Sequence, residues 1–261
     1  MEINNFIVVR FSLKISAGWQ KKAYGDEENR EKWLIHRYRI LRDTIYTSAL
    51  RQTVRPRKLV LLLDEGDAET YEKHFAFDSD LVQPVFAKKG APYEAGVEYI
   101  RSTGLKNIVI SRADSDDIIS DDYIEKVNAE VTRLVEAGQP FDYIVATHGY
   151  RTDGDVIQEI YYSCSPYLSL FREEWDGKNI YDINHEDVLQ YAYFPIESAR
   201  WMQCIHGGNL ANQFMNGMAD RQSFEDSIRN NKKLIAMQRV SAKDNWPENF
   251  GVYNLAFPES F

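Results

Sequence analysis

The sequence contains few cysteines and no long apolar segment. Its two cysteines, Cys164 and Cys204, are too few for a disulfide framework, so we expect a reducing compartment, the cytoplasm. No apolar run approaches the roughly 20 residues that span a bilayer, and no basic segment followed by an apolar one opens the chain. Neither membrane insertion nor export is therefore expected, although peripheral membrane contact through an aromatic or basic patch stays open.

Basic residues are also in the minority. The chain has 31 Lys and Arg against 40 Asp and Glu, a formal net charge of −9. Because nucleic-acid phosphates bind basic surfaces, this balance argues against a broad nucleic-acid-binding face and leaves only a local basic groove open. Hydrophobic residues make up 44% of the 261 residues, which is typical of a globular protein. We find no internal repeat and no Pro/Gly/Ser-rich linker, so a single domain over residues 1–261 is the preferred interpretation.

The first half of the chain alternates strand-like and helix-like segments. Short apolar, β-branched runs predict buried strands, and apolar residues at every third or fourth position predict helices. The expected strands are 4–11, 57–67, 81–86 and 107–111, and the expected helices are 31–52, 68–74, 93–102 and one that Ser120 caps. Residues 16–30 lack periodicity and are expected to form a long loop. This alternation predicts an α/β fold with a mostly parallel sheet, an architecture typical of nucleotide binding.

The second half has a different pattern. Two strand-like segments, 143–152 and 156–162, flank the dipeptide Asp153-Gly154. Because this dipeptide favours tight turns, we expect a β-hairpin here. The sheet is therefore expected to be mixed rather than purely parallel.

Three carboxylates follow the strand-like run in the segment VISRADSDDIIS, residues 109–120. They are Asp114, Asp116 and Asp117, and Asp64 ends an earlier strand. Ligands of open α/β sheets bind at the carboxyl ends of the strands, where all four acids are expected. An Asp-x-Asp pair lets one carboxylate bind Mg²⁺ or Mn²⁺ while the other holds a sugar hydroxyl or a second metal oxygen. The alternative is a solvated, helix-capping turn, and the residues alone leave both interpretations open.

Five segments in order resemble a known family. They are VVRF, WLIHRYRILRDT, LVLLLDE, ISRADSDD and RWMQCIHGGN, and they extend from about Phe6 to Asn212. They resemble the rhamnosyltransferase family of glycosyltransferases, which has the GT-A fold. The resemblance implies a nucleotide-diphosphate-sugar donor and a divalent cation, Mn²⁺ or Mg²⁺, that Asp114 and Asp116 hold on the donor diphosphate. As a Lewis acid, this cation would neutralise charge on the departing nucleotide diphosphate.

The same resemblance implies roles for other residues near the strand ends. Asp64 is expected to contact the nucleobase or the ribose. Arg10 and Arg112 are expected to face the nucleotide, and Asp114 and Asp117 to bind or orient the donor.

Two further candidate groups lie later in the chain. His206 could complete the metal shell or meet the diphosphate, with a structural histidine near a turn as the alternative, and Gly207-Gly208 would allow close approach of the backbone to a ligand. If the reaction inverts the anomeric centre, an acid must accept the proton of the acceptor hydroxyl, and Glu186 and Asp187 in NHED are candidates. Asn184 as a helix cap with acids in the first turn is the alternative use of that motif.

These features together predict a metal-dependent hexosyl- or pentosyltransferase. Its nucleotide-sugar-binding half is expected at 1–139, its acceptor-side half at 140–220 and a C-terminal extension at 221–261. The sugar is rhamnose by the family resemblance, and the expected acceptor is a saccharide hydroxyl. Two alternatives stay open: a non-catalytic nucleotide-sugar or glycan-binding module, and a sugar transferase that acts on nucleic acid.

Overall fold

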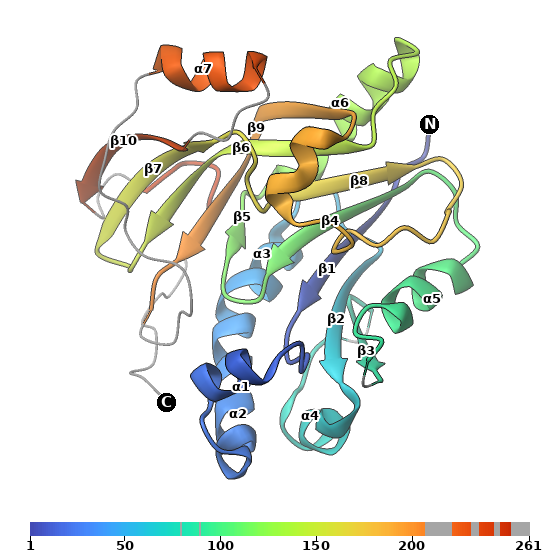
Figure 1. Ribbon diagram of the computed structural model, residues 1–261, viewed down its shortest axis with the longest axis vertical. Helices are drawn as coiled ribbons and strands as arrows, with labels where there is room; N and C mark the ends of the chain where they lie inside the picture. Colours follow the sequence, from blue (N-terminus) through green and yellow to red (C-terminus); the bar gives the residue numbers. More distant parts are fainter. Residues whose placement is uncertain (79, 89, 207–220, 231–234, 243–245, 252–261) are drawn as a thin grey trace.

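The computed structural model describes residues 1–78, 80–88, 90–206, 221–230, 235–242 and 246–251 (Figure 1). Gly207 and Gly208, expected to approach a ligand, lie outside these residues. Within this part of the chain, no helix is long and apolar enough to cross a bilayer.

The described strands form one mixed sheet. They are β1 (Asn4–Arg10), β2 (Lys58–Asp64), β3 (Val82–Ala87), β4 (Ile108–Asp114), β5 (Ile118–Ile119), β6 (Tyr143–Thr152), β7 (Val156–Tyr162), β8 (Leu168–Arg172), β9 (Tyr193–Cys204) and β10 (Ile235–Ala242). Their order is β10-β7-β6-β8-β4-β1-β2-β3, with β9 paired to β6 and β5 paired to β9. Strands β4, β1, β2 and β3 run parallel, and β6 and β7 form the expected antiparallel hairpin. The predicted mixed α/β class is therefore confirmed.

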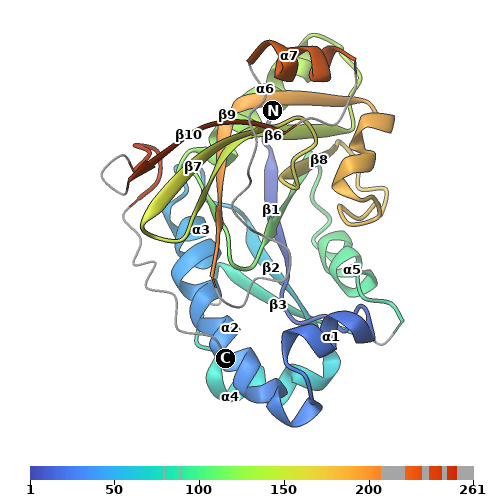
Figure 2. The same cartoon turned by 60° about the vertical axis from the view of Figure 1, so that its left-hand side comes forward.

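Helices cover both faces of the parallel strands, with α2 and α3 on one side and α5 on the other (Figure 2). The described helices are α1 (Ala17–Ala23), α2 (Arg30–Leu41), α3 (Thr47–Arg51), α4 (Ala68–His74), α5 (Glu94–Ser102), α6 (Tyr123–Glu136) and α7 (Arg221–Arg229). Shorter turns are η1 (Glu27–Asn29), η2 (Arg42–Tyr46), η3 (Glu65–Asp67) and η4 (His185–Gln190). The helix predicted at 31–52 is confirmed as α2 and α3, which a π-helical turn, η2, connects.

The prediction of a loop over residues 16–30 was wrong, because this segment contains α1 and η1. The Ser16 hydroxyl accepts a hydrogen bond from the Trp19 N–H at 3.3 Å and so caps the start of α1. The helix buries none of its side chains. Apolar periodicity, which reports burial of one face, is therefore absent from its sequence.

Ser120 does not cap α6, in contrast to the sequence prediction. Its N–H donates to the Arg200 carbonyl at 2.9 Å, and its hydroxyl accepts from the Arg200 N–H at 3.3 Å. Ser120 thus continues the pairing of β5 with β9, and α6 begins at Tyr123 without a side-chain cap. Helix α6 buries one apolar face, formed by Ile124, Val127, Val131 and Leu134.

The two faces of the parallel strands have different neighbours (Figures 1 and 2). The register pairs Val8 with Arg112 and Arg10 with Asp114, so these four residues share one face. Helix α5 covers that face. A small cavity lies between α5 and the strands, and Val8 and Ile110 help to line it. The opposite face lies against α2, α3 and α6 (Figure 2).

A glycine in β6 allows close packing in the second half of the sheet. A Cβ atom on Gly149 would lie 2.2–2.5 Å from three atoms of the Trp201 indole. Trp201 is fully buried and stacks on Tyr167, with the ring centroids 4.6 Å apart. Space for this stack therefore depends on the absence of a side chain at Gly149.

We expect Gly149→Ala to lower the free energy of unfolding by roughly 1–3 kcal/mol, because the added methyl group displaces the Trp201 ring from a close-packed site. Differential scanning calorimetry measures this loss. Gly18→Ala in α1 is the matched control, since nothing lies within 4 Å of its Cβ position. Its stability is expected to be unchanged or slightly higher, and equal melting temperatures for both variants would contradict the packing argument.

Candidate active site

Three candidate residues are the last residues of neighbouring parallel strands. Arg10 ends β1, Asp64 ends β2 and Asp114 ends β4. Because these strands run in the same direction, the three residues lie at the same edge of the sheet, where β1, β2 and β4 end. The structure thus brings this part of the predicted site together at the edge where α/β folds bind ligands.

Two arginines and an acid surround Tyr181 at this edge. The guanidinium carbons of Arg10 and Arg112 lie 4.5 and 4.9 Å from the centroid of its ring. An Arg10 nitrogen is 3.8 Å from a carboxylate oxygen of Asp114. The Tyr181 hydroxyl donates to the Val8 carbonyl at 3.0 Å, and burial raises the pKa of this hydroxyl to about 12. Tyr181 therefore remains a neutral hydrogen-bond donor at physiological pH.

Asp116 has different partners from Asp114. Its Oδ2 accepts a hydrogen bond from Nη1 of Arg37 at 3.2 Å and lies 3.1 Å from Nε2 of His206. Arg37 also donates to the Ser115 hydroxyl. Burial alone would raise the pKa of Asp116, but the Arg37 guanidinium and the hydrogen bond with His206 outweigh it and hold the pKa well below its ordinary value. Asp116 is therefore a charged carboxylate within the protein.

Asp117 faces the interior. Its Oδ2 accepts from the Tyr167 hydroxyl, and its Oδ1 accepts from the Cys204 N–H at 3.1 Å. Burial, reinforced by the nearby charges of Asp116 and Asp114, raises its pKa well above the ordinary value. These contacts connect the acidic segment to β9 and to the stack of Tyr167 on Trp201.

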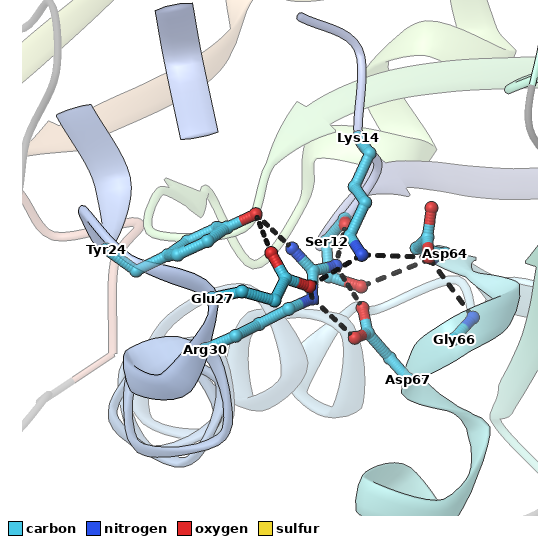
Figure 3. A network of polar contacts seen from close by, with 8 residues as sticks. All are labelled: Ser12, Lys14, Tyr24, Glu27, Arg30, Asp64, Gly66 and Asp67. Carbon is cyan, nitrogen blue, oxygen red and sulfur yellow. Dashed lines mark hydrogen bonds and ion pairs between the residues drawn. The ribbon is translucent and has the colours of Figure 1, made fainter. Parts of the chain in front are cut away.

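Asp64 belongs to a polar network beside the first strands (Figure 3). Its Oδ1 accepts from the Gly66 N–H at 3.1 Å and lies 3.9 Å from the Lys14 ammonium. Lys14 also donates to Glu27 at 2.7 Å. The network thus connects the end of β2 to the segment that carries α1 and η1.

The centre of this network is a buried ion pair between α2 and η3. Arg30 donates from Nε and Nη2 to the two oxygens of Asp67 at 2.7 and 2.6 Å. It also donates from Nη1 to the Tyr24 hydroxyl at 2.8 Å. Because Arg30 and Asp67 are both buried, their pairing holds the start of α2 against the turn that follows Asp64.

The acidic candidates for a general base lie at the start of η4. Glu186 is partly buried, and its Oε1 accepts from the Tyr162 hydroxyl at 3.4 Å. Asp187 is exposed, and its Oδ1 accepts from Gln190 at 3.5 Å. Asn184 occupies the cap position of η4 but makes no side-chain capping bond there.

Arg151 lies in β6, near the acidic segment. It is buried in β6 and donates from Nε to Gln203 of β9 at 2.8 Å. Burial lowers its pKa, and the neighbouring Tyr167, Asp117 and Tyr162 side chains partly offset this effect. Arg151 therefore lies close enough to both Asp117 and Tyr162 to interact with each of them electrostatically.

Sequence reasoning missed Arg37 and Tyr181. Arg37 follows Leu34 by three positions and precedes Leu41 by four, so it continues the buried stripe of α2. A charged residue within an otherwise buried stripe suggests a buried polar partner, and this signal could have identified Arg37 from the sequence. Tyr181 lies between β8 and η4, where neither helix nor strand periodicity marks buried positions.

The donor atoms around Asp116 suit a hard or borderline divalent cation. Asp116 supplies carboxylate oxygen and His206 supplies imidazole nitrogen, and both side chains converge on one point. Among the described residues, no group of three His, Cys, Asp or Glu side chains is arranged to hold a metal ion. Mg²⁺-type cations nevertheless need only one or two protein ligands when substrate phosphates and water complete their shell, so the pair fits such a cation.

We expect Asp67→Asn to lower the free energy of unfolding by about 3–5 kcal/mol, because it leaves the Arg30 charge buried without its counterion. Urea denaturation measures the loss. Glu174→Gln, which removes the exposed partner of Lys106, is the control and is expected to leave the urea midpoint unchanged. A similar midpoint for both variants would contradict the importance assigned to the buried pair.

Solved structures resemble this one at low sequence identity. A "putative nucleotide-diphospho-sugar transferase" from Desulfovibrio desulfuricans G20 is 12% identical with a TM-score of 0.40, and the match covers 78% of this chain and 83% of that one. A manganese complex of a Mycobacterium tuberculosis H37Rv protein is 13% identical with a TM-score of 0.37, covering 78% and 91%. TarS 1–349 of S. aureus is 10% identical with a TM-score of 0.38, covering 77% and 60%.

The fold class and the family expected from the sequence are both confirmed. The structure has the expected α/β architecture, with a mixed sheet whose first half is parallel. No curated protein matches the chain. A family model described as "Putative rhamnosyl transferase" matches residues 4–218, most of the sequence. The chain therefore belongs to this rhamnosyl transferase family, whose members are glycosyltransferases of the nucleotide-sugar type.

Proposed function

We propose that the protein is a metal-dependent glycosyltransferase that moves a sugar, rhamnose by its family, from a nucleotide-diphosphate-sugar to a hydroxyl of a saccharide. One observation carries the proposal. Asp116 and His206, 90 positions apart in the sequence, meet at 3.1 Å beside the edge where β1, β2 and β4 end. A carboxylate and an imidazole that converge at a ligand-binding edge are suited to a cation on a donor diphosphate.

The donor side of the reaction would depend on residues 1–139, with His206 contributed by the second half of the chain. Asp116 and His206 would hold Mn²⁺ or Mg²⁺, and Asp114 would supply an oxygen to the metal shell or to the donor sugar. When bound, the cation neutralises charge on the departing nucleotide diphosphate. Arg37 keeps Asp116 charged and fixes the orientation of its carboxylate.

The other donor-side residues would contact the remaining parts of the donor. Asp64 would bind the ribose or the nucleobase, and Arg10 and Arg112 would face its anionic part. Asp117 acts from the interior, because its contacts with Tyr167 and Cys204 hold the acidic segment in place.

The acceptor side of the reaction would use residues 140–220, and residues 221–261 form an extension to it. We assign the general base to Glu186 rather than Asp187. Glu186 is partly buried and accepts a hydrogen bond from Tyr162, whereas Asp187 is exposed. Glu186 would take the proton from the acceptor hydroxyl while the oxygen of that hydroxyl bonds to the anomeric carbon. The bond from that carbon to the phosphate oxygen breaks in the same step, and the configuration inverts.

We expect Asp116→Asn to abolish sugar transfer and Mn²⁺-dependent nucleotide binding without unfolding the protein, because it removes the charge that the metal would bind. A nucleotide-release assay and calorimetry with nucleotide-sugars measure the two effects. Asp121→Asn, which alters a surface acid paired with Arg51, is the control. Unchanged turnover in Asp116→Asn would contradict the metal-dependent reaction. Binding heat from the wild type without released nucleotide diphosphate would indicate a binding module instead.

We expect Glu186→Gln to lower kcat by roughly 10²–10⁴-fold with little change in the KM for the donor, since loss of a general base affects proton transfer rather than donor binding. Asp187→Asn is the matched control and is expected to retain most activity. Steady-state kinetics with varied donor concentration separates the effects. A larger loss in Asp187→Asn than in Glu186→Gln would reverse the assignment.

A further inference from the structure

Arg112 is a buried arginine that makes no hydrogen bond or ion pair with the described residues. Arg112 is only 7% exposed, and its Nε atom is buried and has no hydrogen-bond partner. Within the part of the chain that the structure describes, no carboxylate, carbonyl or hydroxyl oxygen accepts a hydrogen bond from its guanidinium. The guanidinium instead lies over the face of the Tyr181 ring, with its carbon 4.9 Å from the ring centroid.

This arrangement is costly for the free protein. A guanidinium cannot lose its proton in a protein, so Arg112 keeps its charge when it is buried. Its neighbours toward the core are apolar, because Val8 opposes it on β1 and Ile110 precedes it on the same face of β4. A cation–π contact offsets only part of the hydration that the charge has lost. The buried, unpartnered Nε of a charged guanidinium therefore favours binding of an anionic ligand at Arg112.

The neighbouring charges indicate the sign of that group. Arg10 lies over the same ring, 4.5 Å from its centroid, so two guanidiniums share one aromatic neighbour. Asp114 is the carboxylate paired with Arg10, at 3.8 Å. Two cations with one anion leave an excess of positive charge in a partly dehydrated site, which favours binding of an oxyanion.

The site is distinct from the pair of Asp116 and His206. Arg112, Arg10 and Asp114 share the face of β4 and β1 that lies under α5. Asp116 and the preceding Ser115 instead contact Arg37 of α2, on the opposite face. An oxyanion at Arg112 would therefore be held from the other side of β4.

We propose that Arg112 and Arg10 form a receptor for an oxyanion of the substrate, with Tyr181 holding both guanidiniums in position. The oxyanion is either a phosphate of the nucleotide or the carboxylate of an acidic sugar, since the planar fork of arginine binds both in the same bidentate way. The inference rests on the proposed function, because it takes this strand edge to be the donor site.

The experiment measures thermal shifts in EDTA, so that metal binding at Asp116 does not contribute. The probes are inorganic pyrophosphate and glucuronate, with glucose as the neutral reference. The variant is Arg112→Met, and Arg133→Met, which alters an exposed arginine of α6, is the matched control. We expect pyrophosphate or glucuronate to raise the melting temperature of the wild type and of Arg133→Met, and the probe that does so identifies the source of the oxyanion.

Arg112→Met is expected to lose this ligand-induced shift, with affinity for the effective probe reduced at least ten-fold. Without ligand, its melting temperature is expected to rise by about 2–4 °C, because an uncompensated buried charge has been removed. If Arg112 had only a structural role, the melting temperature of Arg112→Met without ligand would fall instead of rising. Should Arg112→Met fail to fold, Arg112→Lys keeps the charge, lacks the fork, and is expected to bind the probe several-fold more weakly.

Two results would overturn the receptor: no shift of the wild type with either anionic probe, or equal shifts in wild type and the Arg112 variants. Asp116→Asn is expected to retain the shift in EDTA. Because this assay involves neither turnover nor metal, a failure of the receptor leaves the assignment of the transferase reaction untouched. Failure of the transferase reaction would likewise leave the anion-binding result interpretable.

Discussion

The parallel pairing of β1 with β4 determines where the other parts of the site lie. Its register aligns Arg10 with Asp114 and Val8 with Arg112, and it ends both strands at the same edge. The polypeptide that follows each strand must therefore leave the sheet at that edge, bringing the acidic segment next to the polar network around Asp64. Backbone hydrogen bonds thus fix the relative positions of charged groups that side-chain contacts alone would hold poorly.

The three acids at and just after the end of β4 are kept apart by their partners. Asp114 pairs with Arg10 on one face, Asp116 pairs with Arg37 and His206 on the other, and Asp117 turns inward to Tyr167 and Cys204. Each partner comes from a different element. Because like charges so close together repel, this division matters for the pKa values of the buried pair: that of Asp116 lies well below its ordinary value, whereas that of Asp117 lies well above it.

Sequence patterns predicted the elements that bury a regular face. The apolar runs of β1, β2 and β4 and the stripe of α6 follow directly from burial, and the acids after β4 were placed at the correct edge for the same reason. Helix α1 was missed because it buries nothing, and Ser120 was misassigned because pairing with Arg200 outweighs its capping tendency. The role of Arg37 depends on how α2 docks, and that of Tyr181 on how a long connection folds back. Both are tertiary facts that local periodicity does not encode.

Helix α1 has a further consequence for the local stability of the molecule. None of its side chains belongs to the core, so opening its hydrogen bonds exposes almost no apolar surface. Its free energy of local opening therefore belongs to the low end of the range within one protein, while the adjoining pair of Arg30 and Asp67 belongs to the high end. Amide hydrogens of α1 would exchange with solvent quickly while those of β1 and β2 stay protected. The segment beside Asp64 can thus change conformation on its own while the sheet edge keeps its geometry.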